Sequence, residues 1–362
     1  MIFNNPSGSS SVFEGFTGFY GNSSAATAII TNTAAEVAGI DSGQTYFTNT
    51  ARAGSATVIC NGANVSGAGG GTCFFTGNST ADNAILTAMG GANGGAGGLI
   101  QFDDSTTADS ARVVLSGNGT LNISFHALGP LTLGSLEGDG GEVTLGGKSL
   151  VVGSNDFDTV FGGQIQEHGS VTKTGTGTLT LSGANTYTGA TVVSAGALKA
   201  ANRSGSATGT GALNVNAGTL AGKGTISGAV TIGTGSGSGA FLAPAAGTNV
   251  QAMLTIQSAL TFNADATYAC TFRAKRNRAK TDQVIASGVM INSGAMIALS
   301  GQTQGRLTTG LTLTLISNTS ANPISGTFSD LPDGAIVTVN GNHLQASYSG
   351  GDGNDLTLTV VP

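Results

Sequence analysis

Short stretches in which apolar and polar residues alternate recur through the middle of the chain. In each stretch Leu, Val or Ile alternates with Thr, Ser or Asn, and a glycine stands at or just before its start. Alternation with a period of two predicts β-strands with one buried and one solvent-facing side. Glycine permits the positive φ that tight corners need. These stretches are residues 119–124, 142–146, 177–182, 190–194, 211–216 and 228–233.

An aromatic residue recurs every 27 or 28 residues in the first third of the chain. Two alanines spaced by three follow each one, and then an aliphatic residue. A fixed interval indicates one structural unit repeated, whose copies stack to bury a shared core. We therefore expect equivalent side chains to form columns. The aromatic positions are Tyr20, Phe47, Phe75 and Phe102, the alanine pairs are 25/28, 53/56, 81/84 and 108/111, and the aliphatic positions are Ile29, Val58, Ile85 and Val113.

The last hundred residues show longer strand patterns and larger side chains, and residues 344–348 and 356–360 are predicted to pair as a hairpin. A β-sandwich also has many short strands, but it has no reason to repeat its sequence. A solenoid needs an atypical terminal segment to cover its last coil. The predicted fold is therefore all-β. Its segments are a parallel β-helix with 27–28-residue repeats over 1–115, Gly/Thr-rich coils over 116–258 and a C-terminal β cap over 259–362.

Composition narrows the class of protein. The chain has 362 residues, of which 60 are glycine and 9% are charged, against a usual charged fraction of about 25%. The formal net charge of −6 argues against nucleic acid as a partner. No apolar run is long enough to cross a membrane as a helix, so we expect no membrane insertion by this chain. The start shows no signal-peptide pattern, and no motif calls for a cofactor.

One segment resembles a known family. Residues 173–200 read KTGTGTLTLSGANTYTGATVVSAGALKA, which is similar to the autotransporter-associated β-strand repeat of bacterial passenger domains. The resemblance implies a right-handed β-helix that is exported and displayed at a cell surface or released outside the cell. It implies no catalytic residues, because the repeat is structural. The positions that carry it are Leu179, Leu181, Asn185, Tyr187, Thr188, Gly189, Gly196 and Leu198.

Three functions compete for such a chain. The first is a non-enzymatic structural or display solenoid, of which an adhesin that contacts glycans or other surface macromolecules is one form. The second is a self-associating extracellular fibre or matrix protein. The third is a β-helical enzyme that acts on polysaccharides, which would need paired carboxylates in a cleft. Asp103 and Asp104 with the later His168 are the best candidates for such a site. Asp103, however, occupies the repeat position held by Thr48 and Thr76, which favours a solvated corner.

Two further groups of charged residues are candidate binding sites. Asp352 and Asp355 lie in GGDGND, a partial match to a calcium-binding nonapeptide that occurs only once, and a hairpin turn explains it equally well. The other group is a cluster of five basic residues. Removing its charges takes the formal net charge from −6 to −11, so only here does the surface become positive, as a contact to anionic glycan or lipopolysaccharide requires. A solvated loop is the alternative. Its members are Arg273, Lys275, Arg276, Arg278 and Lys280.

The three cysteines allow at most one disulfide. Cys60 and Cys73 lie near the end of one repeat and the start of the next, so they could bond in an oxidising compartment. Two buried thiols are equally consistent with the spacing. Cys270 is expected in the core.

Overall fold

The computed structural model describes residues 1–5, 15–127, 129–246 and 250–362, which form β-strands joined by turns, with no helix among them. Most strands pair in parallel with strands one coil away, as in a parallel β-helix, and this confirms the predicted fold class. The chain divides into two compact units, Met1–Gly189 and Ala190–Pro362. The predicted segment boundaries at residues 115 and 258 lie inside these units and stay predictions.

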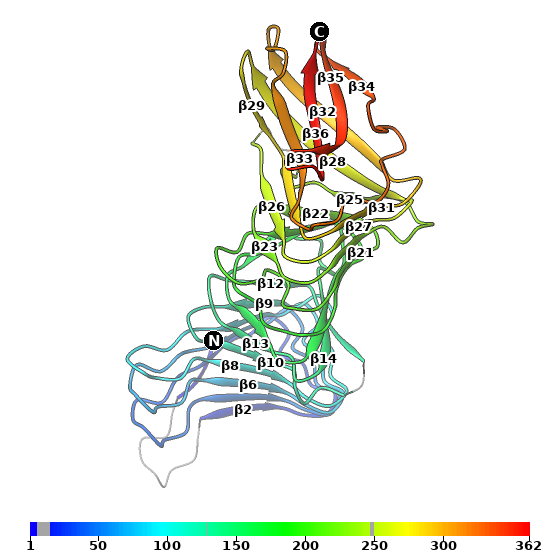
Figure 1. The fold of residues 1–362 in the computed structure, drawn as a ribbon. Coiled ribbons are helices and arrows are strands. Elements are labelled where there is room, and N and C mark those ends of the chain that lie inside the picture. Colours follow the sequence, from blue (N-terminus) through cyan, green and yellow to red (C-terminus); the bar gives the residue numbers. More distant parts are fainter. Residues whose placement is uncertain (6–14, 128, 247–249) are drawn as a thin grey trace. The chain divides into compact units, whose positions relative to one another are not determined.

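The first unit consists of short parallel strands that stack in consecutive coils (Figure 1). In most of these strands alternate residues are buried, which is the structural basis of the period-two pattern. One sheet has the order β1 (Ile2–Asn4), β3 (Ile29–Asn32), β5 (Thr57–Cys60), β7 (Ile85–Ala88), β9 (Arg112–Leu115) and β12 (Ser135–Glu137). A second has the order β16 (Gln164–Gln166), β13 (Glu142–Thr144), β10 (Thr120–Asn122), β8 (Leu99–Phe102), β6 (Thr72–Phe75), β4 (Gln44–Phe47) and β2 (Phe16–Phe19). Further parallel strands are β11 (Pro130–Leu133), β14 (Lys148–Val152) and β17 (Gly169–Lys173), and β15 (Thr159–Phe161) with β18 (Thr178–Leu181).

An aromatic column runs through the core of this unit. Phe47, Phe75 and Phe102 are fully buried and stack with ring centroids 4.8 and 4.6 Å apart and an interplanar angle of 6°. This confirms the predicted column for these three residues. Its first member, however, is Phe19 and not Tyr20, because β2 pairs with β4 in the register Phe19↔Phe47. Tyr20 comes after the strand and is exposed.

The alanine pairs also occupy equivalent core positions. Ala53, Ala81 and Ala108 are fully buried at consecutive coils, next to the in-register bridges Arg52↔Thr80↔Thr107. The aliphatic column was predicted one residue out of phase in two coils. Ile29 and Ile85 face outward, and the buried column reads Ile30, Val58, Leu86 and Val113.

The second unit continues the parallel pairing and then changes to antiparallel strands (Figure 1). Its parallel strands are β19 (Thr191–Val193), β21 (Leu213–Val215), β24 (Val230–Ile232), β27 (Leu260–Phe262) and β31 (Val289–Ile291). A neighbouring sheet holds β20 (Ala197–Ala200), β22 (Gly218–Gly222), β25 (Ala240–Leu242), β28 (Ala266–Lys275) and β29 (Arg278–Thr281), with β32 (Met296–Gln304) also paired to β28. The last sheet has the order β23 (Thr225–Ile226), β26 (Met253–Ile256), β30 (Gln283–Ala286), β33 (Thr312–Asn318), β36 (Asp355–Val361), β35 (Asn342–Gly350) and β34 (Ile336–Val339).

The change to antiparallel pairing occurs at the end of this last sheet. β26, β30 and β33 are parallel neighbours, and β36 then runs antiparallel along β33. The predicted hairpin is confirmed, because β35 and β36 pair antiparallel with Leu344 opposite Val360. In the core of this unit Phe262, Tyr268 and Phe328 pack as an aromatic group with ring centroids 5.1–6.3 Å apart.

All three cysteines are buried and carry free thiols. Cys60 ends β5 and Cys73 lies in β6, so both point into the core of the first unit. Cys270 lies on the buried side of β28, as expected for a core residue.

Candidate functional site

The five basic residues of the cluster lie on one β-hairpin, formed by β28 and β29 with a tight turn at Arg276 and Asn277. β28 alternates buried and outward residues along its ten positions, so Ala274 points inward while Arg273 and Lys275 point outward. The antiparallel register places Arg273 opposite Lys280 and Lys275 opposite Arg278. Residues directly opposite each other project from the same face of a sheet. We call this surface, made of the five cations, the basic hairpin.

These cations lie at the surface of the hairpin. All five are exposed, and none forms an ion pair with an acidic side chain in the part of the chain that the structure describes. Like charges directly opposite each other in a sheet are destabilising. The hairpin holds two such pairs, Arg273 with Lys280 and Lys275 with Arg278. Strand pairing therefore holds these positive charges close together, although their mutual repulsion opposes folding of the hairpin.

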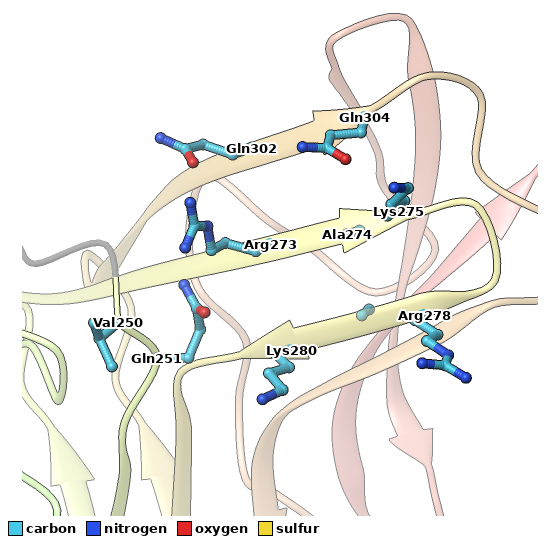
Figure 2. A pocket seen from close by; sticks show the side chains of 10 residues that line it. Val250, Gln251, Arg273, Ala274, Lys275, Arg278, Lys280, Gln302 and Gln304 are labelled. Carbon is cyan, nitrogen blue, oxygen red and sulfur yellow. The ribbon is translucent and has the colours of Figure 1, made fainter.

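A hollow of about 460 Å³ lies over the basic hairpin. Four of the cations line it, and the neighbouring strand β32 adds Gln302 and Gln304, which are paired with Arg273 and Lys275 in the parallel register (Figure 2). A second hollow of about 270 Å³ shares Arg273 and Gln302 and continues along the outer face of β28 and β32 past Thr271 and Ser300. Together the two hollows extend along the outward side of both strands, and cations, amides and hydroxyls line them.

A buried carboxylate anchors the base of the hairpin. Asp282 is fully buried, and its Oδ2 accepts hydrogen bonds from the backbone N–H and the hydroxyl of Thr271, both at 2.8 Å. Its Oδ1 accepts a hydrogen bond from the Ala252 N–H, also at 2.8 Å. These hydrogen bonds fix the base of the hairpin, and Asp282 lines the second hollow together with Arg273 without forming an ion pair with it.

Acidic side chains gather in a different hollow, in the first unit. This acidic hollow, of about 430 Å³, is lined by Glu137, Asp156 and Asp158 together with Arg112 and Phe157. Arg112 binds Glu137 through two parallel hydrogen bonds of 2.9 Å, and its guanidinium lies 5.6 Å from the centre of the Phe157 ring. The three carboxylates make this the place where catalysis would be sought.

The electrostatics of the acidic hollow favour ionised carboxylates. Hydrogen bonding from Arg112 lowers the pKa of Glu137, although its burial acts in the opposite direction. The Thr176 N–H donates to Asp156 Oδ1 at 2.6 Å and lowers the pKa of that carboxyl. The Thr178 N–H donates to Asp158 in the same way at 2.7 Å. A glycosidase needs one carboxylic acid with a raised pKa to protonate the leaving group, and both shifts here have the opposite sign.

The predicted catalytic group is divided between different coils. Asp104 pairs with His126 in an isolated bridge, whereas His168 follows β16, which is separated from β10 by β13. His168 is exposed and lies 2.9 Å from the Thr188 hydroxyl through Nδ1. Asp103 accepts both amide hydrogen bonds of Gln101, and burial raises the pKa of its carboxyl. The structure thus brings His126, and not His168, to the two aspartates.

The two calcium candidates have different environments. Asp352 lies in the exposed turn between β35 and β36. Asp355 begins β36, where its Oδ1 accepts a 2.9 Å hydrogen bond from the Asn318 N–H and where burial raises the pKa of its carboxyl. A turn role accounts for both side chains. Across the described residues, no three His, Cys, Asp or Glu side chains converge as they would around a metal ion.

The motif residues of 173–200 have structural roles. Leu179, Leu181 and Tyr187 are buried in the core, and Asn185 accepts a 2.7 Å hydrogen bond from the Ile165 N–H of the preceding coil. A side chain at Gly189 would meet the Gly169 carbonyl oxygen at 2.0 Å, so only glycine fits there. These positions form corners and core, as expected for a stacking repeat.

Residues 171–200 match the passenger-associated-transport-repeat family. The chain therefore carries a repeat of autotransporter passenger segments, which are exported β-helices. This passenger repeat covers the same residues as the sequence motif. A search of the curated proteins finds no match for the chain. No helix in the described residues is long and apolar enough to cross a bilayer.

Sequence reasoning missed several residues of these surfaces. Gln302 and Gln304 lie about thirty positions from the basic cluster and reach it only through the parallel pairing of β28 with β32. Asp282 carried no motif that distinguished it from an exposed aspartate. Glu137 and Asp156 come from different coils. Strands in this region stack at an interval of about twenty residues, and this interval was the one sequence signal from which their proximity could have been predicted.

Proposed function

We propose that the chain is a non-enzymatic passenger segment that displays a stacked β-helical surface outside the cell. The observation that carries the proposal is the use of carboxylates as links between coils. At several corners of the β-helix an aspartate accepts a hydrogen bond from a backbone N–H of a neighbouring coil. These bonds are Gly54 N to Asp82 (3.0 Å), Gly77 N to Asp104 (2.8 Å), Thr176 N to Asp156 (2.6 Å), Thr178 N to Asp158 (2.7 Å) and Gly235 N to Asp265 (2.6 Å).

A carboxylate in such a link stabilises stacking and is poorly suited to catalysis. Hydrogen bonds from backbone N–H groups favour the ionised form, as the lowered pKa values of Asp156 and Asp265 indicate. A general acid must hold its proton near neutral pH. The acidic side chains of the corners therefore support a structural role over the alternative of a polysaccharide-cleaving enzyme.

The rest of the chain is suited to display. Each coil satisfies the backbone groups of the next through parallel pairing, and the low charge avoids stacking like charges along a column. A solenoid built in this way presents long lateral faces that tolerate variation without loss of the core. An adhesin-like role is the finer form of the proposal.

The enzymatic alternative is tested by incubating the purified chain with polygalacturonate and other acidic and neutral polysaccharides and measuring the release of reducing ends. We expect no release above that of heat-denatured protein. Release that is lost in Asp156→Asn or Glu137→Gln would overturn the proposal. The display role is tested in the source cells with an antibody against the chain. Labelling of intact cells is expected, and labelling only after permeabilisation would contradict it.

A further inference from the structure

We propose that the basic hairpin and the outer face of β32 form a binding groove for an acidic polysaccharide that carries repeated carboxylate or sulfate groups. The proposal goes beyond the display function and does not depend on it. Its starting point is the set of exposed cations on β28 and β29, which hold no acidic partner in the described parts of the chain.

The arrangement of the cations is a built feature of the sheet. Arg273, Lys275, Arg278 and Lys280 project from one side at neighbouring positions of two paired strands. Residues two apart on a strand are separated by about 7 Å and neighbouring strands by about 4.8 Å. The cations therefore form a small grid. Because like charges opposed in this way oppose folding, the grid requires a counter-charge to become favourable, and a ligand with several anionic groups supplies it.

The chemistry of the groove discriminates between anions. A guanidinium binds carboxylate or sulfate oxygens through two parallel hydrogen bonds, and Arg273 and Arg278 provide one at each strand. Beside them, the Gln304 amide on β32 is exposed and can both donate to and accept from sugar hydroxyls. The adjoining hollow adds the Ser300 hydroxyl on β32, while the Thr271 hydroxyl in the same hollow donates to Asp282. A polymer with anionic and hydroxyl groups along its length matches this sequence of donors.

Other polyanions fit less well. Phe272 is the one aromatic residue among those that line the two hollows, and it is buried on the inner side of β28, so its ring is not available for a nucleic-acid base to stack on. The chain without the five cations has a formal charge of −11, which repels a long duplex. The hairpin turn is polar at Arg276 and Asn277, so it has no apolar tip to enter a lipid surface. A flexible polysaccharide can follow the groove and stay away from the acidic side chains of the rest of the protein.

The test compares binding of the full chain to heparin, polygalacturonate, neutral dextran, duplex DNA and vesicles containing phosphatidylglycerol, by calorimetry at 50 and 200 mM salt. The variant Arg273→Gln/Lys280→Gln removes one opposed pair. The control Arg203→Gln/Lys223→Gln removes the same charge from exposed positions that do not line the groove. We expect binding to heparin or polygalacturonate, weaker at high salt, with at least a tenfold loss of affinity in the first variant and less than a twofold change in the control.

The thermal midpoint of Arg273→Gln/Lys280→Gln should equal or exceed that of the wild type, because a repulsive pair is removed. Loss of affinity with an unchanged fold then assigns the site to the groove. Equal losses in both variants, equal binding of dextran, or tighter binding of DNA or vesicles than of either acidic polysaccharide would overturn the proposal. These outcomes are independent of the reducing-end assay, so failure of the groove is distinguishable from failure of the display function.

Discussion

Buried asparagine and threonine side chains form a hydrogen-bonded group inside the first coils. Asn4 donates to Asn32 Oδ1 at 2.8 Å, and Thr17 donates to Asn4 Oδ1 at 2.8 Å. In the next coil Thr45 donates to Asn32 Oδ1 at 2.8 Å. The equivalent positions one coil later are Cys60 and Cys73. Polar contacts across the core thus give way to thiols and then to apolar residues, which keeps every layer of the core filled.

The aromatic column supplies the first prediction at this scale. Phe75 packs between the rings of Phe47 and Phe102, so Phe75→Ala would leave a cavity with stacked rings on both sides. We expect a loss of about 3–5 kcal/mol in the free energy of unfolding, measured by urea denaturation. Phe125→Ala is the control, because Phe125 is 67% exposed, and its effect should lie within about 0.5 kcal/mol. Similar losses in both variants would contradict the column as a source of stability.

The buried thiols make stability depend on alkaline pH. Burial raises the pKa of Cys60 and of Cys270 to about 12, from an ordinary value of 9.0. The folded state therefore keeps protons that the unfolded chain releases above pH 9. Stability is full below that pH and falls as the pH rises toward 12, by at most about 1.4 kcal/mol per pH unit for each thiol. Urea denaturation under reducing conditions at pH 8, 9 and 10 measures this slope.

Cys60→Ala is the matched variant for the alkaline slope. Tyr268 and Tyr348 also have raised pKa values because of burial, and they contribute to the wild-type slope at higher pH. The variant should lose the part that Cys60 contributes between pH 9 and 10. An identical slope in both proteins would show that this thiol ionises equally in the folded and unfolded states.

At the scale of the element, the hairpin of β28 and β29 shows how a charged surface is held in place. Its inner side contributes Tyr268 and Phe272 to the core, and the Tyr268 hydroxyl donates to the Leu315 carbonyl at 2.9 Å. Its base is tied by Asp282 to Thr271 and Ala252. The outer side is therefore free to carry cations, because the inner side and the base provide the stability.

Asp282→Ala tests this support. The substitution leaves the N–H groups of Thr271 and Ala252 without their acceptor, and each buried donor without a partner costs about 1–3 kcal/mol. We expect a lower urea midpoint and weaker binding of acidic polysaccharide, because the hairpin loses its anchor. Asp352→Ala, in the exposed turn before β36, should change neither property. An unchanged midpoint in Asp282→Ala would show that the hairpin is held by its apolar side alone.

At the scale of the whole molecule, the change from parallel to antiparallel pairing decides where stacking stops. Parallel strands continue through β33, beyond the start of the predicted cap at residue 259. β36 then covers the edge of β33, followed by β35 and β34. An uncovered strand edge offers backbone donors and acceptors to other chains, so we expect these three strands to protect the edge of β33 from association with other chains.

Deleting residues 335–362 removes β34, β35 and β36 and uncovers β33. We expect the truncated chain to form larger species and to unfold at a lower temperature than the full chain at the same concentration. Size-exclusion chromatography with light scattering and a thermal melt followed by circular dichroism measure the two effects. Should the truncated chain stay monomeric with an unchanged midpoint, the segment would not be a stability cap.

The sequence by itself determined the class of fold, the passenger repeat at 173–200 and the aromatic column. In a stacked repeat, equivalent residues recur at a fixed interval along the chain, so the interval can be read from the sequence. The sequence did not determine the strand register. The structure places Phe19 in the aromatic column where Tyr20 was predicted, and Ile30 in the aliphatic column where Ile29 was predicted. A shift of one residue is enough to move a side chain from the core to the solvent. The basic cluster was visible in the sequence, but only strand pairing placed its charges opposite one another and beside Gln304. Likewise, only tertiary contacts distinguished Asp282, buried at the base of the hairpin, from the exposed Asp352, because burial depends on neighbours that are distant along the chain.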